Sequence, residues 1–520
     1  MAELRYPIGI QTFSEIIDRG YTYVDKTAYI PKLENSGKYI FLSRPRRFGK
    51  SLLLSTLQAY FEGRRELFKG LALDNLAVDW TPYPVLRFDF NPENYQSEEG
   101  LERRLDAMLR EYEAVFGRDE NDVTPAQRLI RLIRSAHQIT GRRAVILVDE
   151  YDKPLLGIEE NPELFEKNQS VLKGFYGVLK SNDEHIHFAF LTGVAKFNRV
   201  SVFSDLNNLR DISMTNEFAD ICGWTENELT SVFRSGIESM AIELGLSYDE
   251  TVDELRRYYD GYLFAERGSR LYNPFSVLNA LSDRKLNDYW YETGTPTFLA
   301  KRVRKYGIDP SRLNHAQSSA SQLMSVALNM ENPIPLMFQT GYLTIETCKV
   351  RGGQMIYTLR FPNREVELGF AKNLLPLYVP KADDSRSEFN YFKFVDELYD
   401  GQPEAFMKRL AALMKSLPGQ DNRESTYRAV TYLLCVLTGA HTYAERESYK
   451  GRSDLEVETP DFIYLFEFKY NRSLEEAKNQ IEDRDYAGRH AVDKRPVYLI
   501  AANFINRKDE RRLEYEIDRL

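Results

Sequence analysis

The sequence predicts an α/β chain of several domains, built around a parallel β-sheet, and three observations support this prediction. Residues 38–63 read as a short apolar strand, a basic turn and a helix with one apolar face. The apolar run 144–148 ends in the paired carboxylates Asp149 and Glu150. Two strands rich in charge lie within 452–470, near the end of the chain. Because 520 residues are too many for one hydrophobic core, we expect about three or four units.

The composition is that of an ordinary soluble globular protein, with 43% hydrophobic and 28% charged residues. Charged side chains interrupt residues 1–20, which therefore lack the apolar core of a signal peptide. The apolar stretch 432–437 is too short to cross a bilayer. The cysteines Cys222, Cys348 and Cys435 fit neither a disulfide framework nor a zinc-ligand spacing. We expect a cytoplasmic protein without membrane contact.

The net charge of -9 at pH 7 excludes a protein that coats duplex DNA over its whole surface. Any contact with nucleic acid must therefore be local. Short basic clusters occur at 44–47 and 301–305, but such clusters are more often solvated faces than binding sites.

Residues 39–51 have the order of a phosphate-binding loop. The strand is followed by a loop that consists of Arg44, Pro45, Arg46, Arg47, Phe48, Gly49, Lys50 and Ser51. This sequence resembles a Walker A loop, in which backbone N–H groups at the start of the helix cradle phosphates. Lys50 is expected to neutralise the β- and γ-phosphate oxygens, and Ser51 to bind Mg²⁺. Arg44 stands where the pattern has its first glycine, so a chance match within a basic turn is the alternative.

The run 144–150 resembles a Walker B strand, because it is apolar and ends in two carboxylates. Asp149 is expected to hold Mg²⁺ through water, and Glu150 to polarise the water that attacks the γ-phosphate. Two further apolar strands, 85–90 and 187–192, fit the same sheet. A strand between the two motifs and a glutamate after the aspartate indicate the ASCE/AAA-like class of P-loop NTPase. A strand that simply enters solvent at an acidic turn is the alternative.

Thr192, the last residue of the fourth strand, is expected beside the γ-phosphate. Ligands of open parallel sheets bind at the carboxyl ends of strands. A β-branched residue that merely ends a strand is the alternative. Lys196 and Arg199 follow, but one sequence does not separate an arginine finger from a surface charge, so neither is assigned. His185 and His187 share one face of the strand without a third ligand, so no metal site is predicted there.

Taken together, these motifs resemble the AAA-ATPase-like family found in bacteria, whose members are often fused to a nuclease-fold domain. The motifs that carry the resemblance are 6–9 (YPIG), 23–27 (YVDKT), 44–51 (RPRRFGKS), 148–151 (VDEY), 191–193 (LTG) and 206–209 (LNNL). Family members also have arginine at the position of Arg44, so the missing glycine supports the resemblance. It implies an ATP-binding domain, which we place at residues 1–215.

Residues 216–380 are predicted to form a helical lid. The clearest amphipathic stretches are 226–246 and 248–259. Residues 336–345, followed by 355–361, are expected to form a small winged-helix-like unit. Plain packing is the alternative, and no reading of DNA is inferred from this unit. A polar linker at 381–388 then leads to a third domain, 388–520.

The charged strands near the C-terminus are predicted to form a hairpin that brings three charged groups together. With a two-residue loop at 460–461, counting back along both strands places Asp454 opposite Glu467. Lys469 lies on the face of Glu467, because side chains alternate along a strand. Like charges opposite each other are destabilising unless a cation lies between them. The arrangement therefore predicts Mg²⁺ or Mn²⁺ with oxygen ligands.

This pattern resembles the PD-(D/E)XK nucleases, which implies an α/β restriction-endonuclease-like fold for the third domain. The resemblance implies that Asp454 and Glu467 bind the metal and that Lys469 orients or activates water. It adds Gln480, on the following helix, and Glu424, on the first helix, as assisting residues. An exposed strand with alternating charges is the alternative.

The two resemblances together imply a P-loop ATPase coupled to a metal-dependent DNA nuclease. The cofactors implied are ATP and Mg²⁺, with Mn²⁺ as a substitute at the nuclease site. The partners implied are ATP and DNA, and assembly into a homo-oligomer stays open. The alternative is a regulatory NTPase switch whose C-terminal domain binds nucleic acid or protein without cleaving it.

Overall fold

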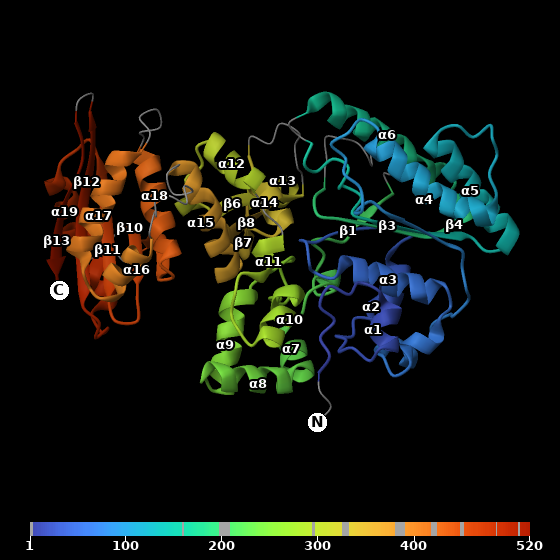
Figure 1. Cartoon of the computed structure of the whole chain (residues 1–520), viewed down its shortest axis with the longest axis horizontal. Coiled ribbons are helices and arrows are strands. Elements are labelled where there is room, and N and C mark those ends of the chain that lie inside the picture. Colours follow the sequence, from blue (N-terminus) through green and yellow to red (C-terminus); the bar gives the residue numbers. More distant parts are fainter. Residues whose placement is uncertain are drawn as a thin grey trace. The chain divides into compact units, whose positions relative to one another are not determined.

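Three β-sheets organise the described residues, which divide into two units (Figure 1). The computed structural model describes residues 4–158, 161–196, 208–293, 297–324, 332–379, 391–417, 424–447, 452–484, 486–507 and 510–520. The first unit comprises Met1–Thr293 and Gln317–Thr358, and the second comprises Gly294–Ala316 and Leu359–Leu520. The linker expected at 381–388 lies outside the described residues.

The first unit is built on a five-stranded parallel sheet with the order β2-β3-β4-β1-β5. Its strands are β1 (Tyr39–Ser43), β2 (Val85–Asp89), β3 (Ala144–Asp149), β4 (Ile186–Gly193) and β5 (Arg210–Asp211). This confirms the α/β fold class and the four predicted strands. Val148 pairs with Leu191, and Leu42 pairs with Thr192. The carboxyl ends of β1, β3 and β4 therefore meet at one edge of the sheet.

Helices cover both faces of this sheet, so β1 and β3 are buried along their whole length (Figure 1). One face carries α1 (Phe13–Asp18), α2 (Tyr29–Ser36) and α3 (Lys50–Phe61), and the other α4 (Gly100–Phe116), α5 (Pro125–Thr140) and α6 (Pro162–Ser181). Local sequence fixes helix ends: Thr124 and Gln127 form a capping box at the start of α5, and Pro125 occupies its first position. Gly141, in the left-handed conformation, ends the same helix.

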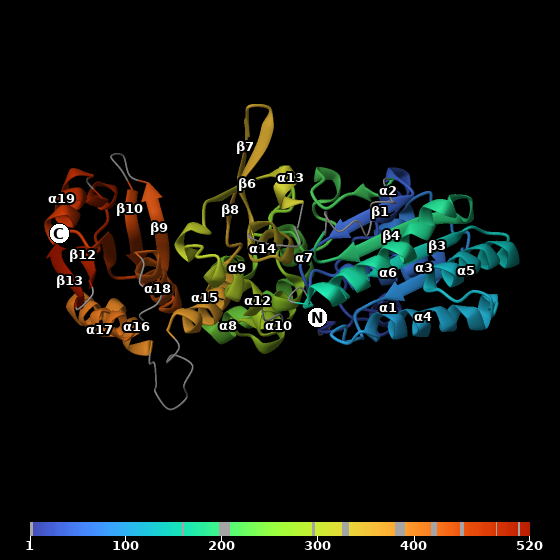
Figure 2. The ribbon, with the colours of Figure 1, turned by 90° about the horizontal axis from the view of Figure 1, so that it is seen from above.

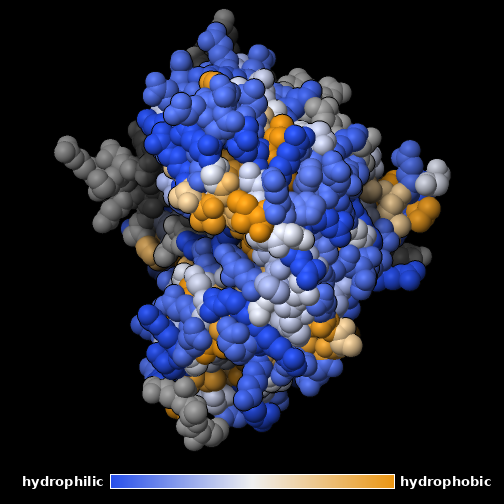
Figure 3. Space-filling model, turned by 90° about the vertical axis from the view of Figure 1, so that its right-hand side faces the viewer, coloured by the Kyte–Doolittle hydropathy of each residue, from blue (hydrophilic) through white to orange (hydrophobic). Residues whose placement is uncertain are grey.

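The face of the molecule in Figure 3 is mainly hydrophilic, with small hydrophobic patches between the polar residues. Exposed apolar side chains near the ends of α4 and α5 include Val115, Val123 and Ile139. Scattered apolar residues of this kind are normal on a protein surface. No described helix has the length and apolar character needed to span a bilayer.

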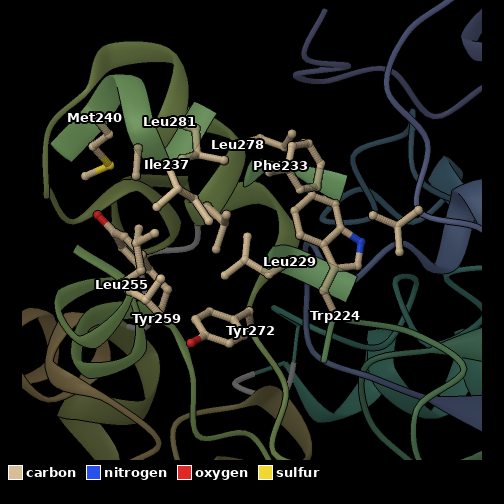
Figure 4. Packing of buried hydrophobic residues seen from close by; sticks show 14 residues of the cluster. Trp224, Leu229, Phe233, Ile237, Met240, Leu255, Tyr259, Tyr272, Leu278 and Leu281 are labelled. Carbon is tan, nitrogen blue, oxygen red and sulfur yellow. The ribbon is translucent and has the colours of Figure 1, made fainter. Parts of the chain in front are cut away.

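A bundle of short helices follows the sheet, as predicted for 226–246 and 248–259. Its members are α7 (Glu226–Val232), α8 (Arg234–Leu244), α9 (Tyr248–Tyr259), α10 (Pro274–Asp283) and α11 (Tyr289–Thr293). The first predicted stretch is broken in two at Phe233, whose buried ring stacks on Trp224 with centroids 4.8 Å apart. Figure 4 shows apolar side chains of these helices converging in one cluster, which includes Leu255.

A small three-stranded sheet has the order β6-β8-β7, and the winged-helix-like unit expected over 336–345 and 355–361 stays a prediction. Its elements are β6 (Ala316–Ser319), α13 (Ala320–Leu323), α14 (Ile334–Thr340), β7 (Thr344–Arg351) and β8 (Gln354–Arg360). Gly352 and Gly353 both have positive φ angles at the tip of the β7–β8 hairpin. Figure 2 shows this hairpin projecting from the rest of its unit, while most of α14 is buried.

The second unit has a mixed five-stranded sheet with the order β13-β12-β11-β10-β9. Its strands are β9 (His441–Glu447), β10 (Arg452–Glu458), β11 (Ile463–Tyr470), β12 (Val497–Arg507) and β13 (Glu510–Arg519). Its helices include α12 (Thr297–Lys305), α15 (Arg364–Tyr378), α16 (Phe392–Tyr399), α17 (Pro403–Ser416), α18 (Glu424–Leu437) and α19 (Leu474–Asp483). Ala477 of α19 packs beside Leu465 on one face of the sheet, and Phe406 of α17 packs against Phe466 on the other. The predicted α/β character of the C-terminal part is confirmed.

Replacement of Leu255 by alanine is expected to destabilise the helical bundle by about 2–5 kcal/mol, because a fully buried leucine leaves a cavity. Ile242→Ala, in the same bundle but 84% exposed, is the matched control and should stay within about 0.5 kcal/mol of the parent. Thermal unfolding of the full chain measures both variants. Equal melting temperatures of the two variants would contradict the assignment of this cluster as the core of the bundle.

Candidate functional site

The loop between β1 and α3 brings Lys50 to the carboxyl edge of the first sheet. Gly49 takes the left-handed conformation (φ 92°) immediately before the helix begins. The Lys50 ammonium is 3% exposed and donates hydrogen bonds to the carbonyl oxygens of Arg44 (3.1 Å) and Pro45 (3.2 Å). It also lies 3.2 Å from Oε1 of Glu150. The lysine and the glutamate predicted to serve one nucleotide are thus in contact.

The carboxylate of Asp149 lies next to this pair and is 2% exposed. The Thr192 hydroxyl donates to its Oδ1 at 3.0 Å, across neighbouring strands. Burial and the charge of Glu150 raise the pKa of Asp149, while a side-chain hydrogen bond from Ser51 lowers it. These hydroxyl and carboxylate oxygens are hard donors and fit Mg²⁺. Glu150 itself has a positive φ of 52°, a strained conformation that residues at functional sites often adopt.

A cavity of about 330 Å³ opens in front of Lys50, Ser51 and Glu150, and the described residues that line it do not include Asp149 or Thr192. Six of the eight predicted loop residues line it, together with Glu150; the six are Arg46, Arg47, Phe48, Gly49, Lys50 and Ser51. Its apolar part is lined by residues that precede the sheet and by others from the helical bundle, among them Ile10, Val24, Trp224, Phe275 and Leu278. Sequence reasoning gave these residues no role, although 6–9 and 23–27 stood out as motifs nearby. The Arg47 guanidinium stacks over the Phe275 ring, 4.7 Å from its centroid.

Arg44, predicted to bind the cofactor, has a different place. Its guanidinium is 1% exposed and donates to four backbone carbonyls, which belong to Ser43, Ser213, Phe218 and Ala219. It also lies 4.2 Å from the centroid of the Phe264 ring, and burial lowers its pKa to about 10. Arg44 therefore anchors the loop from behind and is not among the described residues that line the cavity; that it belongs to the cofactor-binding loop stays a prediction.

Pro45 also lies outside the cavity lining, in contact with the end of α14. A Cβ atom on Gly341 would come within 2.7 Å of the Pro45 ring, so glycine is required at that close approach. The indole N–H of Trp290 donates to the carbonyl oxygen of Arg46 at 3.0 Å. The loop is therefore braced on its outer side by Trp290 of α11 and by the end of α14.

Asp152, which sequence reasoning missed, links the acidic strand end to the segment after β4. Its fully buried carboxylate accepts hydrogen bonds from the backbone N–H groups of Val194 (2.9 Å) and Ala195 (2.6 Å). Burial raises the pKa of Asp152 to about 7. The Tyr151 hydroxyl donates to the Ala195 carbonyl oxygen at 2.7 Å. The only sequence signal was that these residues directly follow Glu150.

The residues left unassigned after β4 have structural contacts where they are described. The Lys196 ammonium lies 2.7 Å from Oδ2 of Asp211, and its backbone N–H donates to Gln339. Arg199, like residues 206–207 of the LNNL motif, lies outside the described residues. His187 stacks on Tyr83. Within the described part of the chain, no group of three or more His, Cys, Asp or Glu side chains is arranged to hold a metal ion.

In the second unit, the hairpin β10–β11 has the predicted register. Leu455 pairs with Phe466, and Thr459 donates from its backbone N–H to the carbonyl oxygen of Phe462 at 2.9 Å. The same register puts Asp454 opposite Glu467, as counting along the strands predicted. The strand phenylalanines face the core, as expected from the alternation of side chains.

Glu467 is the centre of a hydrogen-bond network. Its side chain is 1% exposed, and its Oε1 lies 2.6 Å from the Lys469 ammonium. Lys469 also donates to Oε1 of Gln480 at 2.8 Å, and the Tyr486 hydroxyl donates to Oε2 of Glu467 at 2.9 Å. Burial, followed by the charge of Asp454, raises the pKa of Glu467. The structure therefore joins Gln480, through Lys469, to Glu467. The carboxylate oxygens of Asp454 and Glu467 are of the kind that Mg²⁺ or Mn²⁺ prefers.

Glu424, predicted to assist this site, lies exposed at the first residue of α18. Among the described contacts, no hydrogen bond or ion pair joins it to Asp454 or Glu467. One turn further along the helix, Arg428 places a guanidinium nitrogen 3.8 Å from Oδ1 of Asp454. The helix thus contributes a cation near Asp454 for which sequence reasoning had no signal, and the assisting role of Glu424 stays a prediction.

Comparison with known proteins finds a match to a protein family in each of the two units. Residues 7–203 match the protein family described as "Predicted AAA-ATPase", and residues 422–514 match the "PD-(D/E)XK nuclease superfamily". An uncharacterized protein in the vnfD 5' region of Azotobacter chroococcum mcd 1 is 34% identical over 515 residues, which cover 97% of each chain. The structure of the Aeropyrum pernix ORC2 protein (ADPNP-ADP complexes) matches with a TM-score of 0.25 and 10% identity, over 67% of this chain and 91% of that one.

Replacement of Arg44 by alanine is expected to destabilise the first unit by about 3 kcal/mol or more, because buried carbonyls lose their donor. Arg44→Lys should recover only part of the stability that Arg44→Ala loses, since an ammonium lacks the planar fork of a guanidinium. Thermal unfolding of the full chain measures both, with exposed Arg46→Ala as the control. A parental melting temperature for Arg44→Ala, together with weakened ATP binding, would show that the side chain serves the cofactor rather than the loop.

Proposed function

Because the chain belongs to the family of predicted AAA-ATPases that carry a C-terminal PD-(D/E)XK nuclease-superfamily domain, we propose that it is an ATP-hydrolysing, metal-dependent DNA nuclease. The observation that carries the proposal is that each matched region brings its family's charged residues into contact. Lys50 meets Glu150 in the first, and Lys469 meets Glu467 in the second. We further propose that the state of the nucleotide controls cleavage.

In the ATPase half, each residue has a role that its surroundings support. Lys50, the first residue of α3, neutralises the β- and γ-phosphates, while the backbone N–H groups around it cradle them. Asp149 and Ser51 would hold Mg²⁺, which would stabilise negative charge on the phosphates. Glu150 polarises the attacking water, and Thr192 fixes the neighbouring carboxylate. The apolar part of the cavity is suited to the adenine ring.

In the nuclease half, Asp454, Glu467 and the carbonyl oxygen of Phe468 would hold the metal, which would stabilise charge on the phosphate. The backbone N–H of Phe468 fixes the Asp454 carboxylate, to which it donates at 2.8 Å. Lys469 orients the attacking water, and Gln480 holds the lysine ammonium in place. These contacts limit the number of positions that the lysine and the two carboxylates can adopt.

Lys50→Ala is expected to weaken ATP binding at least about 100-fold, because the cation that faces the phosphates is lost. Glu150→Gln should retain binding and slow hydrolysis about 10²–10⁴-fold, since it removes the base. Equilibrium binding of a fluorescent ATP analogue and release of inorganic phosphate measure the two effects. Exposed Lys69→Ala, in the same unit, is the control. Undiminished ATP binding by Lys50→Ala would rule out this loop as the phosphate site.

Glu467→Ala and Lys469→Ala are expected to reduce DNA cleavage at least about 100-fold, because they remove a metal ligand and the group that orients water. Linear, circular and single-stranded DNA are incubated with the full chain and Mg²⁺ or Mn²⁺, with and without ATP. Exposed Glu482→Ala and Lys393→Ala are the matched controls. Intact DNA in every condition, with ATP still bound, would favour a regulatory NTPase whose C-terminal domain binds without cutting.

A further inference from the structure

The guanidinium of Arg428 lies among three carboxylates of the second unit. Its Nη2 is 3.2 Å from Oε1 of Glu445, and its Nε is 3.8 Å from Oδ2 of Asp309. Its Nη1 is 3.8 Å from Oδ1 of Asp454, the proposed metal ligand. The side chain is 12% exposed, so α18 and its neighbours hold it in a defined place beside the site.

The contact with Asp454 differs from the contact with Glu445. At 3.8 Å, the nitrogen and the Asp454 oxygen are too far apart for a hydrogen bond, so the interaction is one of charge only. The other Asp454 oxygen accepts the Phe468 N–H. Arg428 therefore contributes positive charge at the carboxylate pair without taking the place of a ligand.

Positive charge at this position has opposite effects on the two species that the proposed reaction requires. A guanidinium beside a metal ligand repels a divalent cation and so opposes metal binding. The same guanidinium attracts a phosphate, to which its planar fork can donate two hydrogen bonds. Lys469 lies beside Glu467, so cations from two elements flank the carboxylate pair. An anionic substrate offsets the repulsion that the metal alone would feel.

We propose that Arg428 is a phosphate-binding residue of this site and contacts a DNA phosphate beside the metal-ligand carboxylates. The inference rests on the proposed nuclease function and names a substrate contact that the PD-(D/E)XK pattern does not include. Glu445 holds the arginine in position. Glu445 lies in β9 and has a positive φ of 49°. Its Oε1 also lies 3.1 Å from Nε of Arg312.

Two binding measurements on the full chain separate this role from a purely structural one. Mn²⁺ binding is titrated without DNA, and binding of a short duplex is measured without metal and with Ca²⁺ over a range of salt. For Arg428→Ala we expect Mn²⁺ binding equal to or tighter than the parent, DNA binding about 10-fold weaker, and a salt slope reduced by about one. Arg428→Lys should regain part of the DNA affinity, because it keeps the charge.

Arg312→Ala is the matched control, because Arg312 shares Glu445 but is 63% exposed and lies outside the contact with Asp454. It should change both affinities less than Arg428→Ala does. Weaker Mn²⁺ binding with unchanged DNA binding in Arg428→Ala would make Arg428 a support for Asp454 and overturn the proposal. A DNA affinity of Arg428→Ala equal to that of the parent would also overturn the proposal. If the parent binds both but never cleaves, the nuclease function fails while the binding data still decide the role of Arg428.

Discussion

The buried carboxylate of Asp149 constrains the edge of the first sheet at which the strands β1, β3 and β4 end. A carboxylate that is 2% exposed is costly to ionise unless donors and cations surround it. These groups come from separate segments of the chain: Thr192 from β4, Ser51 from the start of α3, and Arg87 from β2, whose guanidinium lies 3.9 Å away. The strand order is what brings them together, because β1, β3 and β4 are neighbours in the sheet. The site and the core of this unit therefore form together.

In the second unit, carboxylates at low exposure are likewise stabilised by nearby cations and hydrogen-bond donors, but these come from different elements. Asp454 and Glu467 are like charges on neighbouring strands, an arrangement that destabilises a sheet unless cations compensate it. Lys469 comes from the same strand as Glu467, whereas Arg428 comes from a helix that precedes the hairpin. The hydrogen bond from the Tyr486 hydroxyl adds a neutral donor. Both units thus place acidic side chains at low exposure and keep them there with donors from several elements.

Strand positions and hairpin register were predictable because they follow from local rules. A period of two and a two-residue turn fix which side chains face each other, so the opposition of Asp454 and Glu467 could be counted from the sequence. The direction of a long side chain follows no such rule. Arg44 lies in a phosphate-loop motif, yet its guanidinium finds four carbonyls behind the loop, and most of their residues lie far along the chain. Arg428 and Asp152 likewise acquire their partners only through tertiary packing.

The place of Arg44 also explains how the loop dispenses with a glycine. A glycine would permit a tight turn but would leave the loop more freedom before the proposed ligand binds. Here the left-handed conformation is taken by Arg47, at φ 67°, and by Gly49, while Arg44 and Pro45 hold the outer side of the loop against other elements. The conformational entropy is then lost during folding rather than during binding. A loop ordered in advance binds phosphate with a smaller entropic cost, so the arginine substitutes for glycine by restricting the loop instead of freeing it.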